Sequence, residues 1–78
     1  MTITCLQHFQ MQIFCGLKNG KIMVYDQNLW LKSVLEKHRK EVTGMINSGD
    51  LLVSVSKDMD LITWSVKNKV LCFTFRIM

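Results

Sequence analysis

Apolar and polar residues alternate along most of this chain, and the alternation has the two-residue period of β-strands. Segment 2–7 reads Thr-Ile-Thr-Cys-Leu-Gln, and segments 21–25 and 61–66 are rich in β-branched and aromatic residues. A period of two places every second side chain on the same face of a strand. The pattern therefore predicts eight short strands, at residues 2–7, 11–16, 21–25, 30–35, 42–47, 51–56, 61–65 and 70–75.

Short turn signals separate these segments. Asn19 and Gly20 form the dipeptide that most favours a tight hairpin, because both central residues of a type I′ turn take positive φ. Segments 48–50 and 67–69 are typical of further turns, and the chain has no proline. A helix at 29–39 is the one alternative, since its apolar residues also recur at spacings of three and four. A strand at 30–35 followed by a charged loop suits the surrounding pattern better.

The two halves of the chain repeat each other. Segment 3–25 can be laid over segment 42–64 without a gap, so that apolar positions and turn positions coincide. The segment 30–35 then matches 70–75 after one inserted residue. Four short strands in a unit of about 40 residues are the signature of a β-propeller blade.

The second unit resembles the WD-repeat (WD40) family of β-propellers. It carries Lys-His at 37–38, Leu-Val-Ser-Val-Ser-Lys-Asp at 52–58 and Leu-Ile-Thr-Trp-Ser at 61–65. These segments match the Gly-His pair, the Ser-x-Asp turn and the closing Trp-Asp of the family. The unit departs from the family in having Lys37 for Gly, Ser65 for Asp and Met59 in the tight turn, and the first unit is more degenerate.

The resemblance implies an all-β fold of two four-stranded antiparallel blades, a degenerate one at 1–37 and a second at 38–78, within a larger propeller. In the family, four side chains form a hydrogen-bonded tetrad that holds the blade together. The matching positions are His38, Ser56, Asp58 and Trp64. An indole N–H, a hydroxyl, an imidazole and a carboxylate can form such a chain because each donor meets an acceptor. The family uses this set for structure, so we expect no catalytic residues and no enzyme activity.

The length of 78 residues adds a constraint, because a propeller closes with roughly four to eight blades. Two blades leave one apolar face of each uncovered, and repeat proteins below about three units rarely bury enough surface to be stable. We therefore expect the chain to be part of a longer propeller. Assembly of several copies into a ring is the alternative.

Charge suggests where partners bind. Ten Lys and Arg against six Asp and Glu give a net charge of +4. Blade topology places the second turn of each unit and the connection between units on one face, and this face carries Lys18, Arg39, Lys40 and Lys57. The WD40 resemblance implies a protein-interaction scaffold, and these four residues are the predicted contacts for an acidic or phosphorylated protein segment. Alternatively, the charges only keep the turns soluble.

Two other functions stay open at this point. One is a small basic β-domain that binds nucleic acid by stacking bases on Phe9, Phe14, Phe73 and Phe75. We do not expect this, because Lys and Arg do not form a stripe interleaved with aromatic residues. The other is a truncated product without independent function.

Other chemistry finds little support in the sequence. There is no glycine-rich phosphate loop, no Gly-x-Ser-x-Gly and no metal-spaced histidine pair, so we expect no cofactor and no metal. Three cysteines without a Cys-x-x-Cys pair argue for a reduced, intracellular chain in the cytoplasm or nucleus. Cys5, Cys15 and Cys72 lie in apolar strands and are expected to be buried. No apolar run approaches the ~20 residues of a membrane-spanning helix, so we expect no membrane partner.

Overall fold

The computed structural model of the chain describes residues 2–66 and 70–76, and this part of the chain consists of strands and turns. It confirms the all-β class, and every strand begins and ends within two residues of its predicted bounds. The predicted strand at 30–35, rather than the alternative helix, is what forms. In the described residues no helix exists that could cross a membrane. The strands are β1 (Ile3–Phe9), β2 (Gln12–Leu17), β3 (Lys21–Asp26), β4 (Leu31–Glu36), β5 (Val42–Ser48), β6 (Leu51–Ser56), β7 (Asp60–Ser65) and β8 (Val70–Arg76).

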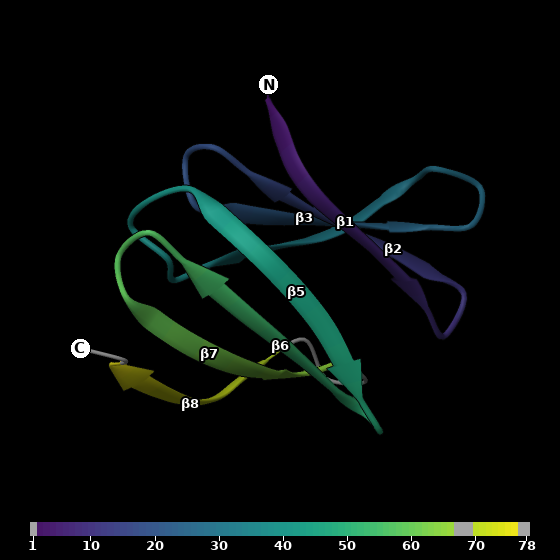
Figure 1. Cartoon of the computed structure of the whole chain (residues 1–78). Coiled ribbons are helices and arrows are strands. Elements are labelled where there is room, and N and C mark those ends of the chain that lie inside the picture. The colour runs from purple at the N-terminus through teal and green to yellow at the C-terminus, as the bar shows by residue number, and fades with distance from the viewer. Residues whose placement is uncertain (1, 67–69, 77–78) are drawn as a thin grey trace.

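The strands form two antiparallel sheets of four, each in chain order. The first sheet has the order β1-β2-β3-β4 and the second β5-β6-β7-β8. The sheets pack face to face, with β5 of the second sheet against β1 and β2 of the first (Figure 1). The connection 37–41 joins them, and the expected division between residues 37 and 38 falls in it.

The repeat in the sequence is also a repeat in the backbone. A bulge between Ile3 and Cys5 has its counterpart between Val42 and Gly44, at the equivalent place in the second half. In the last strands, Leu31 lies opposite Tyr25 and Leu71 lies opposite Trp64. Tyr25 and Trp64 are 39 residues apart, whereas Leu31 and Leu71 are 40 residues apart. The strand pairing therefore contains the one inserted residue that the sequence predicted.

The core lies between the two sheets. From the first sheet Phe14, Ile22 and Val24 are fully buried, and from the second Leu52 and Ile62 are fully buried. Burying one such side chain contributes roughly 1.5–3 kcal/mol. Because each sheet presents every second residue to this core, the two-residue period of the sequence is what allows it to form.

A close approach and several side-chain hydrogen bonds hold β5 and the turn after it against the first sheet. A Cβ added at Gly16 would lie 2.6 Å from Cys5 Sγ and 2.9 Å from the Val42 side chain, so this glycine makes room both for Cys5 opposite it and for β5. The Thr4 hydroxyl donates to the Val42 carbonyl at 2.5 Å. At the rim of the same contact the Gln7 amide donates to Asn47 at 2.6 Å and the Gln10 amide to Asp50 at 3.0 Å.

The β2–β3 turn differs in type from the sequence prediction. Gly20 has a φ of 94°, whereas Asn19 is not among the residues with positive φ, so the turn is not type I′. Instead the Gly20 N–H donates to the Leu17 carbonyl at 3.1 Å, and the Asn19 side chain accepts from the Lys21 N–H at 3.0 Å. The type I′ expectation was wrong: the bond from Gly20 to Leu17 makes Lys18 and Asn19 the central residues of the turn and Gly20 its last residue. Gly20 is also needed for space, because a Cβ on it would lie 2.5 Å from the His38 carbonyl oxygen.

Candidate functional site

Three segments meet at one end of the molecule: the β2–β3 turn (18–20), the connection 37–41 and the β6–β7 turn (57–59). We call this the basic end, and it lies at the left in Figure 1. The Lys57 N–H donates to the Glu41 carbonyl at 3.0 Å, which ties the β6–β7 turn to the connection. Gly20 packs against the carbonyls of His38 and Lys40, which ties in the β2–β3 turn. The basic end is therefore one continuous surface built from both halves of the chain.

A chain of buried polar side chains lies beneath this surface. The Trp64 Nε1–H donates to the Ser54 hydroxyl at 2.9 Å, and that oxygen lies 2.7 Å from His38 Nε2. On its other side, His38 Nδ1 lies 3.3 Å from Asp58 Oδ2. A carboxylate only accepts, so Nδ1 carries the proton, and a neutral imidazole then accepts the Ser54 hydroxyl proton at Nε2. All four side chains thus have a hydrogen-bond partner within the buried network.

The serine of this network is Ser54, and the expectation of Ser56 was wrong. Trp64 lies directly opposite Leu52, so the next residue on the same face of β6 is Ser54. Ser56 lies a further two residues along, roughly 6.6 Å away, beyond the reach of the indole. Ser56 instead donates to the Lys40 carbonyl at 3.1 Å and accepts from the Asp58 N–H at 3.1 Å, so it holds the connection to the β6–β7 turn.

Asp58 is buried and ionised. Burial by itself would raise the pKa of this carboxyl, but hydrogen bonds outweigh it and lower the pKa to about 2. The backbone N–H groups of Arg39 and Asp60 donate to it at 2.8 and 2.9 Å, and the Ser56 hydroxyl and His38 lower the pKa further. A carboxylate that accepts several such bonds favours its charged form. Asp58 therefore fixes the backbone of both the connection and the β6–β7 turn.

Among the described side chains of the first sheet there is no equivalent of the Trp64–Ser54–His38–Asp58 network. Cys15 occupies the position of Ser54, and Tyr25 that of Trp64, as the equivalent strand pairings show. Cys15 is buried, as expected, whereas Cys5 is only half-buried, and the Cys72 side chain is outside the described part. Burial raises the pKa of the Cys15 thiol, and Cys5 raises it further. At the positions of Ser54 and Trp64, the first half therefore has Cys15 and Tyr25 in place of the hydrogen-bonded pair of the second half.

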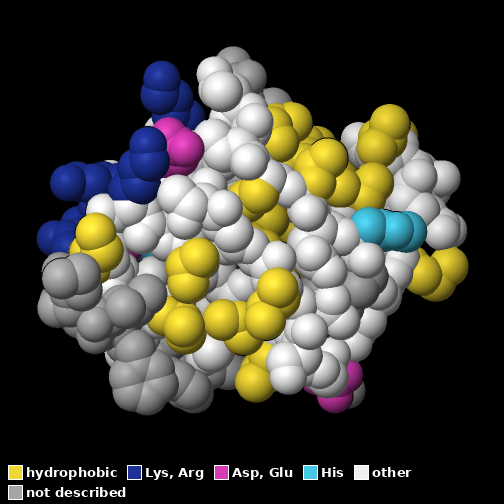
Figure 2. All heavy atoms as spheres, in the orientation of Figure 1, with side chains coloured by type: hydrophobic (Ala, Val, Ile, Leu, Met, Phe, Trp, Pro, Cys, Tyr) yellow, Lys and Arg dark blue, Asp and Glu magenta, His cyan; other side chains and the backbone are white. Residues whose placement is uncertain are grey.

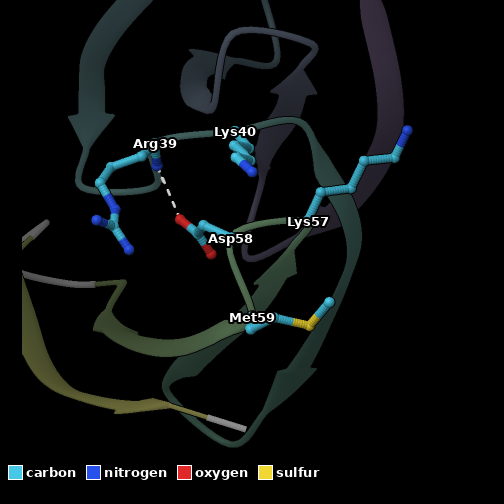
Figure 3. A pocket seen from close by; sticks show the side chains of 5 residues that line it. All are labelled: Arg39, Lys40, Lys57, Asp58 and Met59. Atoms are coloured by element: carbon cyan, nitrogen blue, oxygen red, sulfur yellow. Dashed lines mark hydrogen bonds between the residues drawn. The ribbon is translucent and has the colours of Figure 1, made fainter. Parts of the chain in front are cut away.

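An open depression of about 490 Å³ lies on the basic end, lined by Arg39, Lys40, Lys57, Asp58 and Met59 (Figure 3). The Arg39 and Lys57 side chains point to opposite sides of Asp58. Arg39 Nη2 lies 4.0 Å from Asp60 Oδ2, and Lys57 Nζ lies 3.3 Å from Glu41 Oε1. Each of these cations therefore has a carboxylate beside it.

Lys18 and Lys40, the other two predicted contacts, are exposed, and the described residues place no carboxylate within ion-pair distance of either. Figure 2 shows Lys and Arg side chains gathered at this end of the molecule. Six basic and four acidic side chains of the surrounding segments leave a net charge of +2, the difference of these two counts. They are Lys18, Lys21, Lys37, Arg39, Lys40, Lys57, Glu36, Glu41, Asp58 and Asp60.

Sequence reasoning missed an exposed apolar tip at the other end of the first sheet. Leu29 and Trp30, in the β3–β4 turn, have 70% and 73% of their surface exposed. The Asp26 carboxylate accepts from the N–H groups of Asn28 and Trp30 at 2.9 and 3.0 Å, which fixes the turn. The signal was in the repeat: this turn carries the apolar residues Leu29 and Trp30, whereas its counterpart 67–69, which lies outside the described residues, reads Lys-Asn-Lys.

The described residues offer no metal site and little for base stacking. In 2–66 and 70–76, no three His, Cys, Asp or Glu side chains are arranged to hold a metal ion. Phe14 is fully buried and so is not available to stack on a base. The side chains of Phe9, Phe73 and Phe75, the other aromatics of the nucleic-acid alternative, lie outside the described part.

Comparisons with known proteins identify the fold. The β-propeller domain of Cps50 (Swd1) from Myceliophteria thermophila superposes with a TM-score of 0.88 at 20% identity, over 95% of this chain and 24% of that one. The two sheets are β-propeller blades. The computationally designed Ika8 protein also matches, with a TM-score of 0.85, 23% identity and the same coverage. This two-blade chain spans about a quarter of the length of each. No protein-family model and no curated protein matches it.

Proposed function

We propose that this chain belongs to a WD-repeat propeller that acts as a non-catalytic scaffold and binds another protein through its basic end. The second blade supports the WD-repeat assignment, because His38, Asp58 and Trp64 join Ser54 in one buried hydrogen-bonded network. The side chains of His38 and Asp58 are only 0% and 1% exposed, and each makes its hydrogen bonds within the fold. The network therefore serves the structure of the blade rather than a reaction.

The observation that carries the binding proposal is that buried groups hold the basic end rigid. Asp58 accepts from the Arg39 N–H at 2.8 Å, and Ser56 donates to the Lys40 carbonyl at 3.1 Å. The backbone at two of the exposed cations is therefore already ordered before a partner arrives. Binding costs less conformational entropy when the contacting segment is pre-ordered.

The arrangement of the cations indicates an extended acidic segment as the partner. Arg39 and Lys57 point to opposite sides of the depression, so one compact anion would not touch both (Figure 3). An acidic or phosphorylated peptide lying across the depression would reach both cations and continue to Lys40. Charge-assisted hydrogen bonds from Arg and Lys to carboxylate or phosphate would supply the specificity.

Fluorescence anisotropy with a labelled peptide of alternating glutamate and serine tests this proposal. We expect the peptide to bind, with an affinity that falls as salt is added. Lys40→Glu should weaken binding about tenfold, which corresponds to about 1.4 kcal/mol. Lys32→Glu is the matched control, because Lys32 is also exposed and the charge change is equal, but it lies on β4 away from the depression.

Two outcomes would overturn the proposal. One is equal weakening by Lys40→Glu and Lys32→Glu, which would show that only net charge matters. The other is tighter binding of a single-stranded oligonucleotide than of the acidic peptide, with a steeper salt dependence. That result would favour the nucleic-acid alternative.

A further inference from the structure

The contact between the two blades has an uncovered counterpart on each outer face of the blade pair. We call the face of the first blade that points away from the second the leading face. Ile3 and Leu6 on it are the repeat equivalents of Val42 and Met45, which the first blade covers. Val42 and Met45 are 0% and 8% exposed, whereas Ile3 and Leu6 are 48% and 61% exposed. The leading face therefore presents the apolar residues that the internal contact buries.

The opposite face of the second blade, which we call the trailing face, is uncovered as well. It has a hollow of about 290 Å³ lined by Gly44, Met45, Ile46, Val53, Val55 and Leu61. Val53 and Leu61 are the equivalents of Phe14 and Ile22, which are fully buried under the second blade. Figure 2 shows hydrophobic side chains gathered over the second sheet. The hollow on the second blade therefore corresponds to the surface of the first blade that β5 covers.

A hydroxyl on the trailing face has one carbonyl acceptor where its counterpart in the internal contact has two. The single Thr4 hydroxyl proton is shared between the Gly16 carbonyl of its own blade, at 3.1 Å, and the Val42 carbonyl of the next blade. Thr43 is its equivalent, and it makes the bond within its own blade, to the Val55 carbonyl at 3.3 Å. In a repeated contact, the Thr43 hydroxyl would meet the carbonyl of the residue equivalent to Val42, which is Ile3.

Side-chain volume is exchanged between neighbouring strands on the trailing face. The internal contact needs Gly16 on β2, with Cys5 opposite it on β1. On the trailing face the two sizes are reversed. Val55 on β6 is the equivalent of Gly16, and Gly44 on β5 is the equivalent of Cys5, and these two residues also lie opposite each other. A Cβ at Gly44 would lie 3.4 Å from Val55 Cγ2, so the glycine leaves room for the valine within its own blade. The Ile3 side chain of a second copy would therefore lie farther from Val55 than Val42 lies from Gly16.

We propose that the trailing face binds the leading face of a second copy of this chain, so that copies join head to tail as the two blades do. Ile3 and Leu6 of the second copy would enter the hollow. They are similar in size and polarity to Val42 and Met45, which make the internal contact with the first blade. Such a contact is heterologous, because the two faces differ, and it closes into a ring if the rotation permits. Two to four copies would supply the four to eight blades of a propeller.

The rim of the contact between copies would be weaker than the internal rim. The Gln7–Asn47 and Gln10–Asp50 hydrogen bonds would be replaced by Ile46 beside His8 and Gly49 beside Met11. The contact between copies therefore rests on apolar burial and on Thr43. We expect it to depend on protein concentration, and expect the melting temperature to rise with concentration.

Sedimentation equilibrium of the 78-residue chain tests the proposal. We expect a discrete mass between two and four times 9.1 kDa at high concentration. Leu6→Glu should block the leading face and Ile46→Glu the trailing face, because each places a charge where the contact is apolar. Both residues are more than 60% exposed in the single chain, so neither change disturbs its own core. Each variant alone should remain at 9.1 kDa.

Mixing the two variants gives the sharpest result. One intact leading face and one intact trailing face remain in the mixture, so we expect a one-to-one pair of about twice 9.1 kDa. If either variant alone loses β-structure by circular dichroism, mixing should restore it, because the intact contact stabilises both copies. Leu29→Glu is the control, since Leu29 is equally exposed but lies on neither face, and this change should leave the assembly intact.

Several results would overturn the proposal. A wild-type chain that stays monomeric at all concentrations has no such contact. If a mixture of Leu6→Glu and Ile46→Glu forms no pair, head-to-tail joining is excluded. It is also excluded if the chain assembles but Leu6→Glu does not change the size of the assembly. Loss of assembly in Leu29→Glu would assign the contact to the apolar tip instead. The acidic-peptide experiment is independent of these results, because it probes the basic end.

Discussion

At the scale of single residues, Asp58 couples the folding of the second blade to the shape of the basic end. Its carboxylate accepts from two backbone N–H groups and from the His38 ring, and it lies directly beneath Arg39 and Lys57. A buried charge is tolerated because these donors compensate its lost hydration. The same residue therefore stabilises the blade and orders the surface that we propose binds a partner.

This role predicts a specific loss of stability in acid. The pKa of Asp58 is about 2 in the folded chain and 3.8 ordinarily, so its contribution is complete above about pH 4 and is lost as pH falls through about 2. The difference corresponds to roughly 2 kcal/mol of unfolding free energy. Urea unfolding at a series of pH values measures it. Asp58→Asn should be less stable at pH 7 and should lose less stability between pH 4 and pH 2; an unchanged slope would contradict this assignment.

The resemblance to the WD-repeat family predicted three residues of the buried network correctly and one wrongly. His38, Asp58 and Trp64 were identified from a family pattern in which each type of residue has a fixed position. The Ser-x-Asp pattern selected Ser56, whereas the serine that forms the network, Ser54, lies two residues earlier on the same face of the strand. The choice between them depends on strand register, since Trp64 lies opposite Leu52, and register is a property of the folded sheet.

At the scale of elements, the β2–β3 and β6–β7 turns are the same turn built from different residues. Gly20 and Met59 occupy equivalent positions in the two halves, and both have positive φ, 94° and 68°. Their N–H groups donate to Leu17 and Ser56 at the same distance, 3.1 Å. Glycine adopts this conformation without a steric penalty, whereas a residue with a Cβ does not.

Exchanging these residues should therefore change stability in opposite directions. Met59→Gly should stabilise the chain by about 1 kcal/mol, because it removes the strain of a left-handed methionine. Gly20→Ala should destabilise it by roughly 2 kcal/mol, because the added Cβ would meet the His38 carbonyl oxygen at 2.5 Å. Thermal and urea unfolding measure both. Met59→Ala is the control: it shortens the side chain but keeps the Cβ, so stabilisation by it would contradict the backbone explanation.

The strands were predictable because a half-buried strand has apolar residues at every second position of its sequence. Turn geometry was not predictable, since the Asn-Gly pair predicts a hairpin, but in the folded chain Gly20 takes positive φ and Asn19 does not. The bulges at Ile3/Cys5 and Val42/Gly44 were not predicted either. One extra residue opposite a continuous partner interrupts the alternation too briefly to be seen in the sequence.

At the scale of the whole molecule, two imperfect copies of one unit pack face to face. The first copy contributes Phe14, Ile22 and Val24, and the second contributes Leu52 and Ile62. Repetition predicted the blades, because each unit needs a neighbour to cover its apolar face. It did not predict how closely they approach, which depends on the glycine at position 16 meeting the valine at position 42 in the other half of the chain.

That contact offers the most direct test of the account, which holds that the two halves are adjacent propeller blades. Nuclear Overhauser effects between the α-protons of Gly16 and the methyl groups of Val42 should be strong, because a Cβ at Gly16 would lie only 2.9 Å from Val42 Cγ1. Val42→Ala identifies the signals. A head-to-tail contact between copies would bring Val55 to Ile3 instead, so the two contacts are distinguishable. A chain whose amide spectrum shows folded β-structure, but in which Gly16 and Val42 give no such effect, would contradict the packing described.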